Sequence, residues 1–464
     1  MTEDEKRAAA ALRSGRLVDA ERGAMAILSQ RETAPALWIL AGTRRLGGRP
    51  DEALDLYRRA VALDGDFLPA LQDLGAAFMG AGDAESALAT FRRAVAVAPD
   101  RTAAHSAMLV AMHYCGSVGA AEIAEAHRVA GRRYPTMPRP PRRPQEAGEP
   151  LRVGFVSADF RAHATAAFLP PLLRHRDPAR WRAFLYSGVT VPDAATRRFR
   201  TMADGWVDAA FLDDTVLAAR IAADGIDVLV DLNGHTAGGR LGLFARRPAP
   251  LQATWLDYVH STGLPAIDVF ITDADHLPAS EDDRHVETPM RLAAGSFCFD
   301  PPADAPEPSP RDGPFVFGSC NALEKLSAET LATWARILEA VPETRLRIAA
   351  AALDRAHGRR RIREALAAGG VAPDRVELMG ETDRAGMLAR YGGIDLQLDS
   401  FPYSGGLTTL EALWMGVPTL TFPGDRIAGR HSASHLRRAG LGYLVATDRD
   451  DYMARAAAIA RNPG

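Results

Sequence analysis

The stretch LQLDSFPYSGGLTTLEALWMGVP, residues 396–418, contains the most informative change of pattern in the chain. It opens on a short apolar run typical of a buried strand, and a glycine pair, Gly405 and Gly406, then precedes a segment with helical spacing. A strand, a glycine loop and a helix in this order form half of a parallel βαβ unit. We therefore expect a helix whose first turn contains Thr408 and Thr409 and which runs through Leu413.

The same alternation of apolar runs and helical segments extends on both sides of this stretch. The runs occupy residues 152–157, 183–187, 226–232, 251–256 and 269–272, and, after a proline-rich break, residues 315–319, 345–350, 376–379, 396–398 and 419–422. Such alternation predicts parallel sheets covered by helices on both faces. Two sets predict two Rossmann-like lobes facing one another across a cleft, with ligands beyond the carboxyl ends of the strands.

The first 130 or so residues instead repeat with a period of 34 residues. Five residues recur at that spacing: Leu40, Gly48, Ala53, Tyr57 and Ala60 return as Leu74, Gly82, Ala87, Phe91 and Ala94. An ordinary helical bundle does not explain five coincidences at one spacing. Weaker copies precede and follow, the last with a helix running through Glu125 to Arg132. The period predicts three to four repeats of the tetratricopeptide type, with a concave surface that holds a protein or peptide.

Two proline-rich segments set the expected domain boundaries. PTMPRPPRRPQEAGEP is too rich in proline for a helix or a central strand, and PPADAPEPSPRDGP forms a second break. The prediction is a tetratricopeptide-repeat domain at 1–134, a linker at 135–150, a first Rossmann-like lobe at 151–300, an interdomain linker at 301–314 and a second Rossmann-like lobe at 315–464.

The composition narrows the class of partner. The chain has 464 residues, 47% of them hydrophobic, which is enough for two or three domains with real cores. A net charge of -3 gives no global basic field, so we expect neither nucleic acid nor a membrane surface as partner. Three widely spaced cysteines argue against a disulfide framework, and the acidic N-terminus lacks the apolar core of a signal peptide. These features predict a cytoplasmic protein.

Lysine is almost absent from the chain. Of 55 basic residues only Lys6 and Lys325 are lysines. Because arginine is used almost everywhere else, we interpret Lys325 as a functional residue rather than a casual surface charge.

Residues 401–418 resemble the donor-binding loop and helix of the GT-B glycosyltransferases, and in detail those of bacterial O-GlcNAc-transferase-type proteins. Companion segments follow in family order and cover nearly all of residues 151–440: LRVGFVSADFRAH, IDVLVDLNGHTAGGRLGLFARRPAPLQATWLDY, FVFGSCNALEKLSAETLATWARIL and FPGDRIAGRHSAS. The resemblance implies an α-helical tetratricopeptide solenoid followed by an α/β GT-B fold of two Rossmann-like lobes. It also implies a protein glycosyltransferase without metal or bound cofactor that inverts the sugar.

The resemblance assigns the donor diphosphate to Lys325, which would stabilise the leaving group, and gives Asn321 a part in shaping the nucleotide site. A compact ammonium suits that task without the fork geometry of arginine.

The glycine loop is the second donor element. Free amides after Gly405 and Gly406, with the hydroxyls of Thr408 and Thr409, suit a diphosphate, and Glu411 would reach a ribose hydroxyl. The alternative is an ordinary glycine loop with a threonine cap, which is common in α/β proteins.

The first lobe contributes the other candidates. His163, in DFRAH, corresponds to the family's active-site histidine, and histidine is a natural base near neutral pH. Asp159 either positions that loop or caps a helix. His235 and Thr236, in DLNGHTAGG, would contact the donor sugar or phosphate; a packing role is the alternative for this histidine.

Asp273 and Asp275 have the spacing that another glycosyltransferase fold uses for metal, but we expect a turn there and no metal. Three positions depart from the family pattern. Met387 and Leu407 stand where the family has histidines, and Asp257 alters the LGYP motif of the acceptor-side loop. These changes leave open a donor whose base or sugar differs from those of UDP-GlcNAc.

The predicted function is transfer of a sugar from a nucleotide-sugar donor resembling UDP-GlcNAc to a Ser or Thr of a protein acceptor on the repeats. Two alternatives stay open: a flagellin glycosyltransferase that uses a CMP-nonulosonic acid, and a repeat scaffold with a degenerate transferase region. Repeat surfaces can also pair with themselves, so a homo-oligomer stays open too.

Overall fold

The computed structural model describes residues 1–144, 146–302, 305–307 and 313–462, and it divides into two compact units. The first unit comprises Met1–Ser117, Pro310–Tyr403 and Arg449–Gly464, and the second comprises Val118–Ser309 and Ser404–Asp448. Within the described residues, every helix is too short or too polar to span a bilayer. The sequence-based boundaries separate repeats from lobes, whereas these units group most of the repeats with part of the second lobe.

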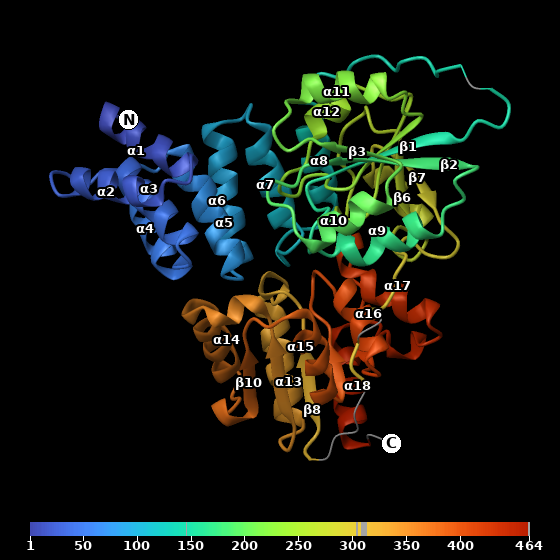
Figure 1. Ribbon diagram of the computed structural model, residues 1–464. Coiled ribbons are helices and arrows are strands. Elements are labelled where there is room, and N and C mark those ends of the chain that lie inside the picture. The colour runs from blue at the N-terminus through green and yellow to red at the C-terminus, as the bar shows by residue number, and fades with distance from the viewer. Residues whose placement is uncertain (145, 303–304, 308–312, 463–464) are drawn as a thin grey trace. The chain divides into compact units, whose positions relative to one another are not determined.

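The first unit begins with paired helices that carry the predicted 34-residue pattern (Figure 1). The helices are α1 (Glu3–Arg13), α2 (Leu17–Leu28), α3 (Ala34–Leu46), α4 (Pro50–Leu63), α5 (Leu68–Gly80), α6 (Ala84–Val97) and α7 (Thr102–Met112). Gly15, Gly48 and Gly82 occupy the turns within successive pairs with φ of 74°, 76° and 78°. This left-handed conformation strains other residues, which explains why glycine recurs there.

The small and large residues of the repeat pack as the pattern predicts. Ala53, Tyr57 and Ala60 are at most 1% exposed. A Cβ built at Gly75 would lie 2.4 Å from the Phe91 ring, so the aromatic fills the space that glycine leaves. Close approach of paired helices therefore depends on these small residues.

The rest of the first unit is built around parallel strands in the order β10-β9-β8-β11. The strands are β8 (Val316–Ser319), β9 (Arg345–Ala349), β10 (Val376–Met379) and β11 (Leu396–Leu398), and the main helices are α13 (Ala328–Ala340), α14 (Ala356–Ala368), α15 (Arg384–Ala389) and α18 (Arg449–Arg461). The indole N–H of Trp334 donates to the hydroxyl of Tyr452 at 3.2 Å, which fixes α18 against α13. The C-terminal helix thus belongs to this unit.

Helix α5 and its turn lie against the short helix η2 (Leu323–Lys325) within the first unit. A Cβ at Gly82 would lie 2.8 Å from the carbonyl oxygen of Leu323, and the guanidinium of Arg361 donates to the carbonyl of Leu326 at 2.9 Å. The repeats and the loop that carries Lys325 therefore form one packed body.

The second unit contains a seven-stranded parallel sheet in the order β3-β2-β1-β4-β5-β6-β7. Its strands are β1 (Leu151–Ser157), β2 (Trp181–Ser187), β3 (Gly205–Asp208), β4 (Val228–Asp231), β5 (Leu251–Thr254), β6 (Val269–Thr272) and β7 (Thr288–Arg291). The sequence reasoning located β1, β2, β4, β5 and β6, but missed the two edge strands, β3 and β7.

Successive residues of the central strands enter different cores, as a pleated sheet requires. Leu229 packs into one apolar cluster with α11 (Asp214–Ala223) and α12 (Leu241–Ala245). Val230 packs into another with α9 (Thr165–Arg174) and α10 (Ala194–Met202). Helices therefore cover both faces, which is the predicted α/β layering (Figure 1).

Helix α8 (Ala120–Gly131), predicted as part of the last repeat, belongs to the second unit. Its backbone meets a loop directly, since a Cβ at Gly131 would lie 1.6 Å from the carbonyl oxygen of Gly263. This unit also holds α16 (Leu407–Trp414), β12 (Thr419–Leu420) and α17 (His431–Arg438).

The predicted linker at 135–150 falls within the second unit, and where it is described it packs against other parts of that unit. The backbone N–H of Met137 donates to the carbonyl of Ala245 at 2.8 Å, and Arg143 pairs with Glu149 and Asp227. Residue 145, and residues 303–304 and 308–312 of the predicted second linker, lie outside the described residues.

Candidate active site

Lys325 ends the short helix η2, just beyond the carboxyl end of β8. Its Nζ lies 4.3 Å from the centroid of the Tyr403 ring, which stacks on the ring of Tyr114 at 4.7 Å. An ammonium over an aromatic face is stabilised by the ring quadrupole. Residues from the repeats, η2 and the end of the β11 loop thus meet around one cation.

Burial lowers the pKa of the half-buried Lys325 from its usual 10.5 to about 8, although Asp399 and Glu324 act in the opposite direction. An adjacent anion would act against this effect of burial, because a nearby negative charge favours the protonated ammonium. This environment agrees with the interpretation of Lys325 as a functional residue.

Asn321 lies in the same group as Lys325. Its side-chain amide donates to Oδ1 of Asp399 at 3.3 Å, and the backbone N–H of Ser400 donates to the same oxygen at 2.9 Å. The sequence analysis did not single out Asp399. An acidic residue directly after an apolar strand, as in LQLDS, was the signal that would have identified it.

The glycine loop and its helix lie in the second unit, and α16 begins at Leu407 as predicted within one residue. A Cβ built at Gly406 would find no other described atom within 4 Å, so the backbone there is open to close approach. Thr408 is half-buried, whereas Thr409 is buried with its Oγ1 2.7 Å from Oγ of Ser432. The Thr409 hydroxyl therefore also has a structural role. The assignment of a diphosphate to this loop stays a prediction.

Ser432 also donates to the carbonyl of Gly405 at 2.9 Å, which ties the glycine loop to α17. Glu411, the predicted ribose contact, is buried in α16 at 3% exposure. Leu407, at the start of α16, packs against the apolar cluster around Phe168. Met387 lies half-buried in α15 of the first unit.

A buried series of hydrogen-bonded polar groups holds the start of α17, the helix to which the glycine loop is tied. Nδ1 of His276 lies 2.7 Å from Asp273, and its Nε2 lies 2.8 Å from Nδ1 of His431, the first residue of α17. Burial alone would raise the pKa of Asp273, but hydrogen bonds from His276 and Ser296 lower it overall. Asp273 also accepts from the backbone N–H of Asp275, so these aspartates form the predicted turn.

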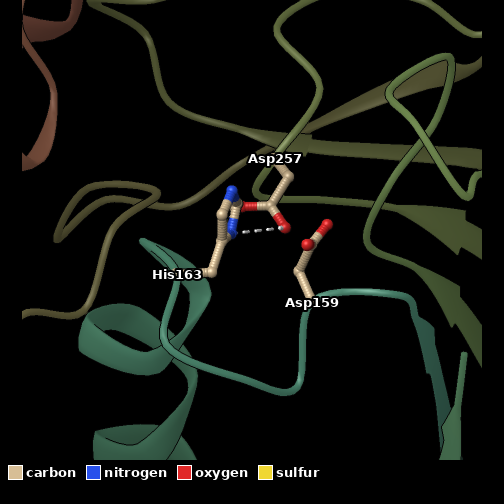
Figure 2. A group of neighbouring side chains, drawn as sticks. All are labelled: Asp159, His163 and Asp257. Atoms are coloured by element: carbon tan, nitrogen blue, oxygen red, sulfur yellow. Dashed lines mark ion pairs between the residues drawn. The ribbon is translucent and has the colours of Figure 1, made fainter. Parts of the chain in front are cut away.

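His163 lies in the loop between β1 and α9, close to two carboxylates (Figure 2). Its Nδ1 lies 3.0 Å from Oγ1 of Thr165, and that hydroxyl donates to Oδ2 of Asp257 at 2.6 Å. The side chain of His163 is 36% exposed, whereas that of Asp257 is 7% exposed. The histidine therefore faces outward from a buried acidic partner.

Burial raises the pKa of Asp257 to about 7 and lowers the pKa of His163. Asp159 accepts from Arg161 at 2.8 Å and from the side-chain amide of Asn233 at 2.7 Å. The second contact joins the loop after β1 to the loop after β4, so Asp159 positions both loops.

Asp159, His163 and Asp257 place possible ligand atoms within 4.8 Å of one another (Figure 2). Both carboxylates already accept hydrogen bonds, from Arg161 and Asn233 and from Thr165. A guanidinium at this position opposes the binding of a second cation. We therefore describe the group as a polar cluster around His163 and not as a metal site.

His235 is buried at 4% exposure, and its Nε2 hydrogen-bonds to the carbonyl of Thr262 at 2.8 Å. Its ring packs edge-on against His127 and Tyr258, with centroids 5.5 and 5.2 Å away. Thr236 donates to the carbonyl of Asn233 at 2.8 Å. These contacts are those of packing residues, and a role for His235 and Thr236 at the donor stays a prediction.

Residues 133–300 and 309–463 match Glycosyl transferase family 41. The chain belongs to this family. Residues 46–111 match a tetratricopeptide repeat family, which confirms the repeat reading. The predicted resemblance, the solenoid and the GT-B type of catalytic fold are thereby supported at the level of sequence.

The chain is also similar to a mutant of the O-GlcNAc transferase of Thermobaculum terrenum, with a TM-score of 0.92 and 36% identity over 100% of this chain and 91% of that one. This match confirms the predicted fold class.

Two curated plant relatives are similar as well. Probable UDP-N-acetylglucosamine–peptide N-acetylglucosaminyltransferase SPINDLY of Solanum lycopersicum is 36% identical over 78% of this chain and 40% of that protein. The corresponding SEC protein of Arabidopsis thaliana is 29% identical over 67% of this chain and 33% of that protein. The chain thus spans well under half the length of these relatives.

Proposed function

We propose that the chain is a protein O-glycosyltransferase that moves GlcNAc from UDP-GlcNAc to a Ser or Thr hydroxyl of a protein held by the repeats. The observation that carries the proposal is the environment of Lys325 in a member of family 41. A half-buried ammonium with a pKa near 8, set on an aromatic ring beyond a strand end, is suited to a diphosphate.

In this proposal Lys325 stabilises the negative charge that develops on the departing nucleotide diphosphate, which is where most of the rate arises. His163 takes up the proton of the attacking hydroxyl, since it is the partly exposed base of the cluster around it. No metal ion is required, because the lysine supplies the positive charge. Chelation with EDTA is therefore expected to leave transfer unchanged.

The decisive experiment is intact-mass analysis of candidate acceptor proteins co-expressed with this chain. We expect an added N-acetylhexosamine with the wild type and with Lys6→Ala, the matched control at the other lysine, and none with Lys325→Ala. If Lys325→Ala leaves the added mass unchanged, the catalytic assignment is wrong and the scaffold alternative is favoured.

Donor choice needs its own measurement, because Met387 and Leu407 depart from the family pattern. Calorimetry with UDP, GDP and CMP should show tightest binding of UDP. Tighter binding of CMP would favour a nonulosonic acid donor, and tighter binding of GDP another sugar; either result would overturn UDP-GlcNAc as donor while leaving the transferase proposal intact.

A further inference from the structure

A continuous chain of hydrogen bonds links His163 to Asp257 within the second unit. Nδ1 of His163 and Oγ1 of Thr165 are 3.0 Å apart, and Oγ1 of Thr165 and Oδ2 of Asp257 are 2.6 Å apart. The direct distance from Nδ1 to Oδ2 is 3.9 Å, too long for a hydrogen bond. The hydrogen-bonded connection between the imidazole and the carboxylate therefore runs through the Thr165 hydroxyl.

The Thr165 hydroxyl has a single proton, and this sets the direction of the chain. An ionised carboxylate can only accept, so Thr165 donates to Asp257. The Thr165 oxygen then accepts from Nδ1–H of His163, and Nε2 carries no proton.

We propose that Asp257 is a positioning residue that acts through Thr165 to hold His163 in the tautomer whose Nε2 is free of a proton and able to accept one from the acceptor hydroxyl. This inference rests on the proposed function for the identity of the hydroxyl. Asp257 is one of the positions where the sequence departs from the LGYP pattern described above.

The proton balance of the step is simple. The bond from the acceptor oxygen to the sugar carbon forms as the bond from that carbon to the diphosphate oxygen breaks, and the hydroxyl proton moves to Nε2 of His163. The resulting imidazolium keeps its Nδ1–H···Thr165···Asp257 chain, so the new positive charge faces a carboxylate. The proton later leaves to solvent.

Other groups around these hydrogen bonds also affect the protonation of His163 and Asp257, some favouring it and some opposing it. Asp159 and Arg161 face His163, and Asp159, Asp231 and Arg161 face Asp257. The backbone N–H of Thr165 lies 3.4 Å from Nδ1 of His163, a contact that favours the opposite tautomer. Without Asp257 we therefore expect Nε2 to carry the proton.

Because burial raises the pKa of Asp257 to about 7, this carboxylate is fully ionised only above neutral pH. Only there do the hydrogen bonds from His163 through Thr165 to Asp257 all have the direction described above. As the pH falls through this value, a protonated Asp257 donates to Thr165, Thr165 donates to Nδ1, and the proton moves to Nε2. The acidic limb of the pH profile should therefore depend on Asp257 as well as on His163.

The test is nitrogen NMR of the full chain with labelled histidine rings at pH 8, with the His163 signals identified by their loss in His163→Gln. We expect the Nδ1–H tautomer in the wild type and in Thr165→Ser, and the Nε2–H tautomer in Thr165→Val and Asp257→Ala. Thr201→Val, an exposed threonine whose hydroxyl donates within α10, is the matched control and should leave the signals unchanged. Unchanged signals from the other histidines establish that each variant is folded.

An Nε2–H tautomer in the wild type at pH 8, or an Nδ1–H tautomer that persists in Asp257→Ala, would overturn the inference. In transfer assays Asp257→Ala should lower kcat about 10- to 100-fold, because a positioning residue contributes less than the roughly 10²- to 10⁴-fold of the general base itself, with KM for the donor unchanged. If the tautomer changes as expected between the wild type and Asp257→Ala but the wild type transfers no sugar, the proposed function is rejected and the inference about Asp257 stands.

Discussion

At the scale of single residues, Lys325 shows how burial prepares a charged group for a ligand. Its ammonium rests on the Tyr403 ring, and burial lowers its pKa to about 8. A bound diphosphate would raise that pKa again, since an adjacent anion favours the charged form. Binding would then be linked to uptake of a proton.

This linkage predicts that UDP affinity falls as the pH rises above about 8, by up to about tenfold per pH unit. The reason is that the free protein loses the Lys325 proton in this range, whereas the complex keeps it. Calorimetry at pH 7, 8 and 9 measures the effect. Lys325→Ala should bind weakly with little dependence on pH over this range, and an equally steep decline in that variant would contradict the assignment.

A second residue-scale prediction concerns His285. Its ring stacks on that of His260 with centroids 4.6 Å apart, and burial lowers its pKa to about 4. The unfolded chain therefore binds more protons than the folded one between about pH 6.5 and 4, so His285 costs stability as the pH falls through this window.

The variant His285→Phe should remove this cost. The unfolding free energy of the variant minus that of the wild type should increase by about 2 kcal/mol as the pH falls from 7.5 to 5. The increase should be about 1.4 kcal/mol per pH unit below pH 6.5. Asp231 and Asp257, whose pKa values are raised, act with the opposite sign in both proteins, so the difference isolates His285. Urea titrations measure it, with the exposed His175→Gln as control; a difference independent of pH would refute the account.

At the scale of elements, the sequence predicted the central strands and missed the edges. Strand β7 contains Pro289, which a central strand excludes but an edge strand tolerates, and β3 is a four-residue segment with a glycine and an aspartate. Neither has the continuous apolar run that revealed the strands buried on both faces. The missing information was tertiary, because an edge strand is defined by its neighbour.

The residues of the candidate site likewise fall into those that a local motif predicts and those that only the folded structure brings together. Lys325, Asn321 and the start of α16 were recognisable because each follows one strand in one short motif. The chain from His163 through Thr165 to Asp257 joins segments 92 residues apart and depends on side-chain directions that no local pattern encodes. The Thr409 contact with Ser432 was missed for the same reason.

Helix α8 provides an element-scale prediction. A Cβ at Gly131 would lie 1.6 Å from the carbonyl oxygen of Gly263, so Gly131→Ala must push the helix away from the loop. We expect a loss of about 3 kcal/mol or more, at the upper end for overpacking, because the clash is with backbone. Gly119→Ala, at the start of the same helix with φ of -83° and no other described atom within 4 Å, should be nearly neutral. Chemical denaturation compares the two; equal stabilities would contradict this packing.

At the scale of the whole molecule, the scarcity of lysine makes one site addressable. Besides the N-terminal amine, only Lys6 and Lys325 can react with an amine-directed acyl ester. We expect UDP to protect one of these three groups at pH 8, because Lys325 is the amine placed to meet a diphosphate. Intact mass counts the labels, and Lys325→Arg should abolish the protection. Protection that persists in that variant would place the nucleotide elsewhere.

The packing of Gly82 against Leu323 has a mechanical consequence for a client protein. Since the solenoid and the Lys325 loop form one body, cargo seated on the repeats would travel together with the ammonium. A force on the bound protein would then also act on the Lys325 loop and on its contact with the leaving nucleotide. The rate of donor turnover would therefore depend on which protein is bound.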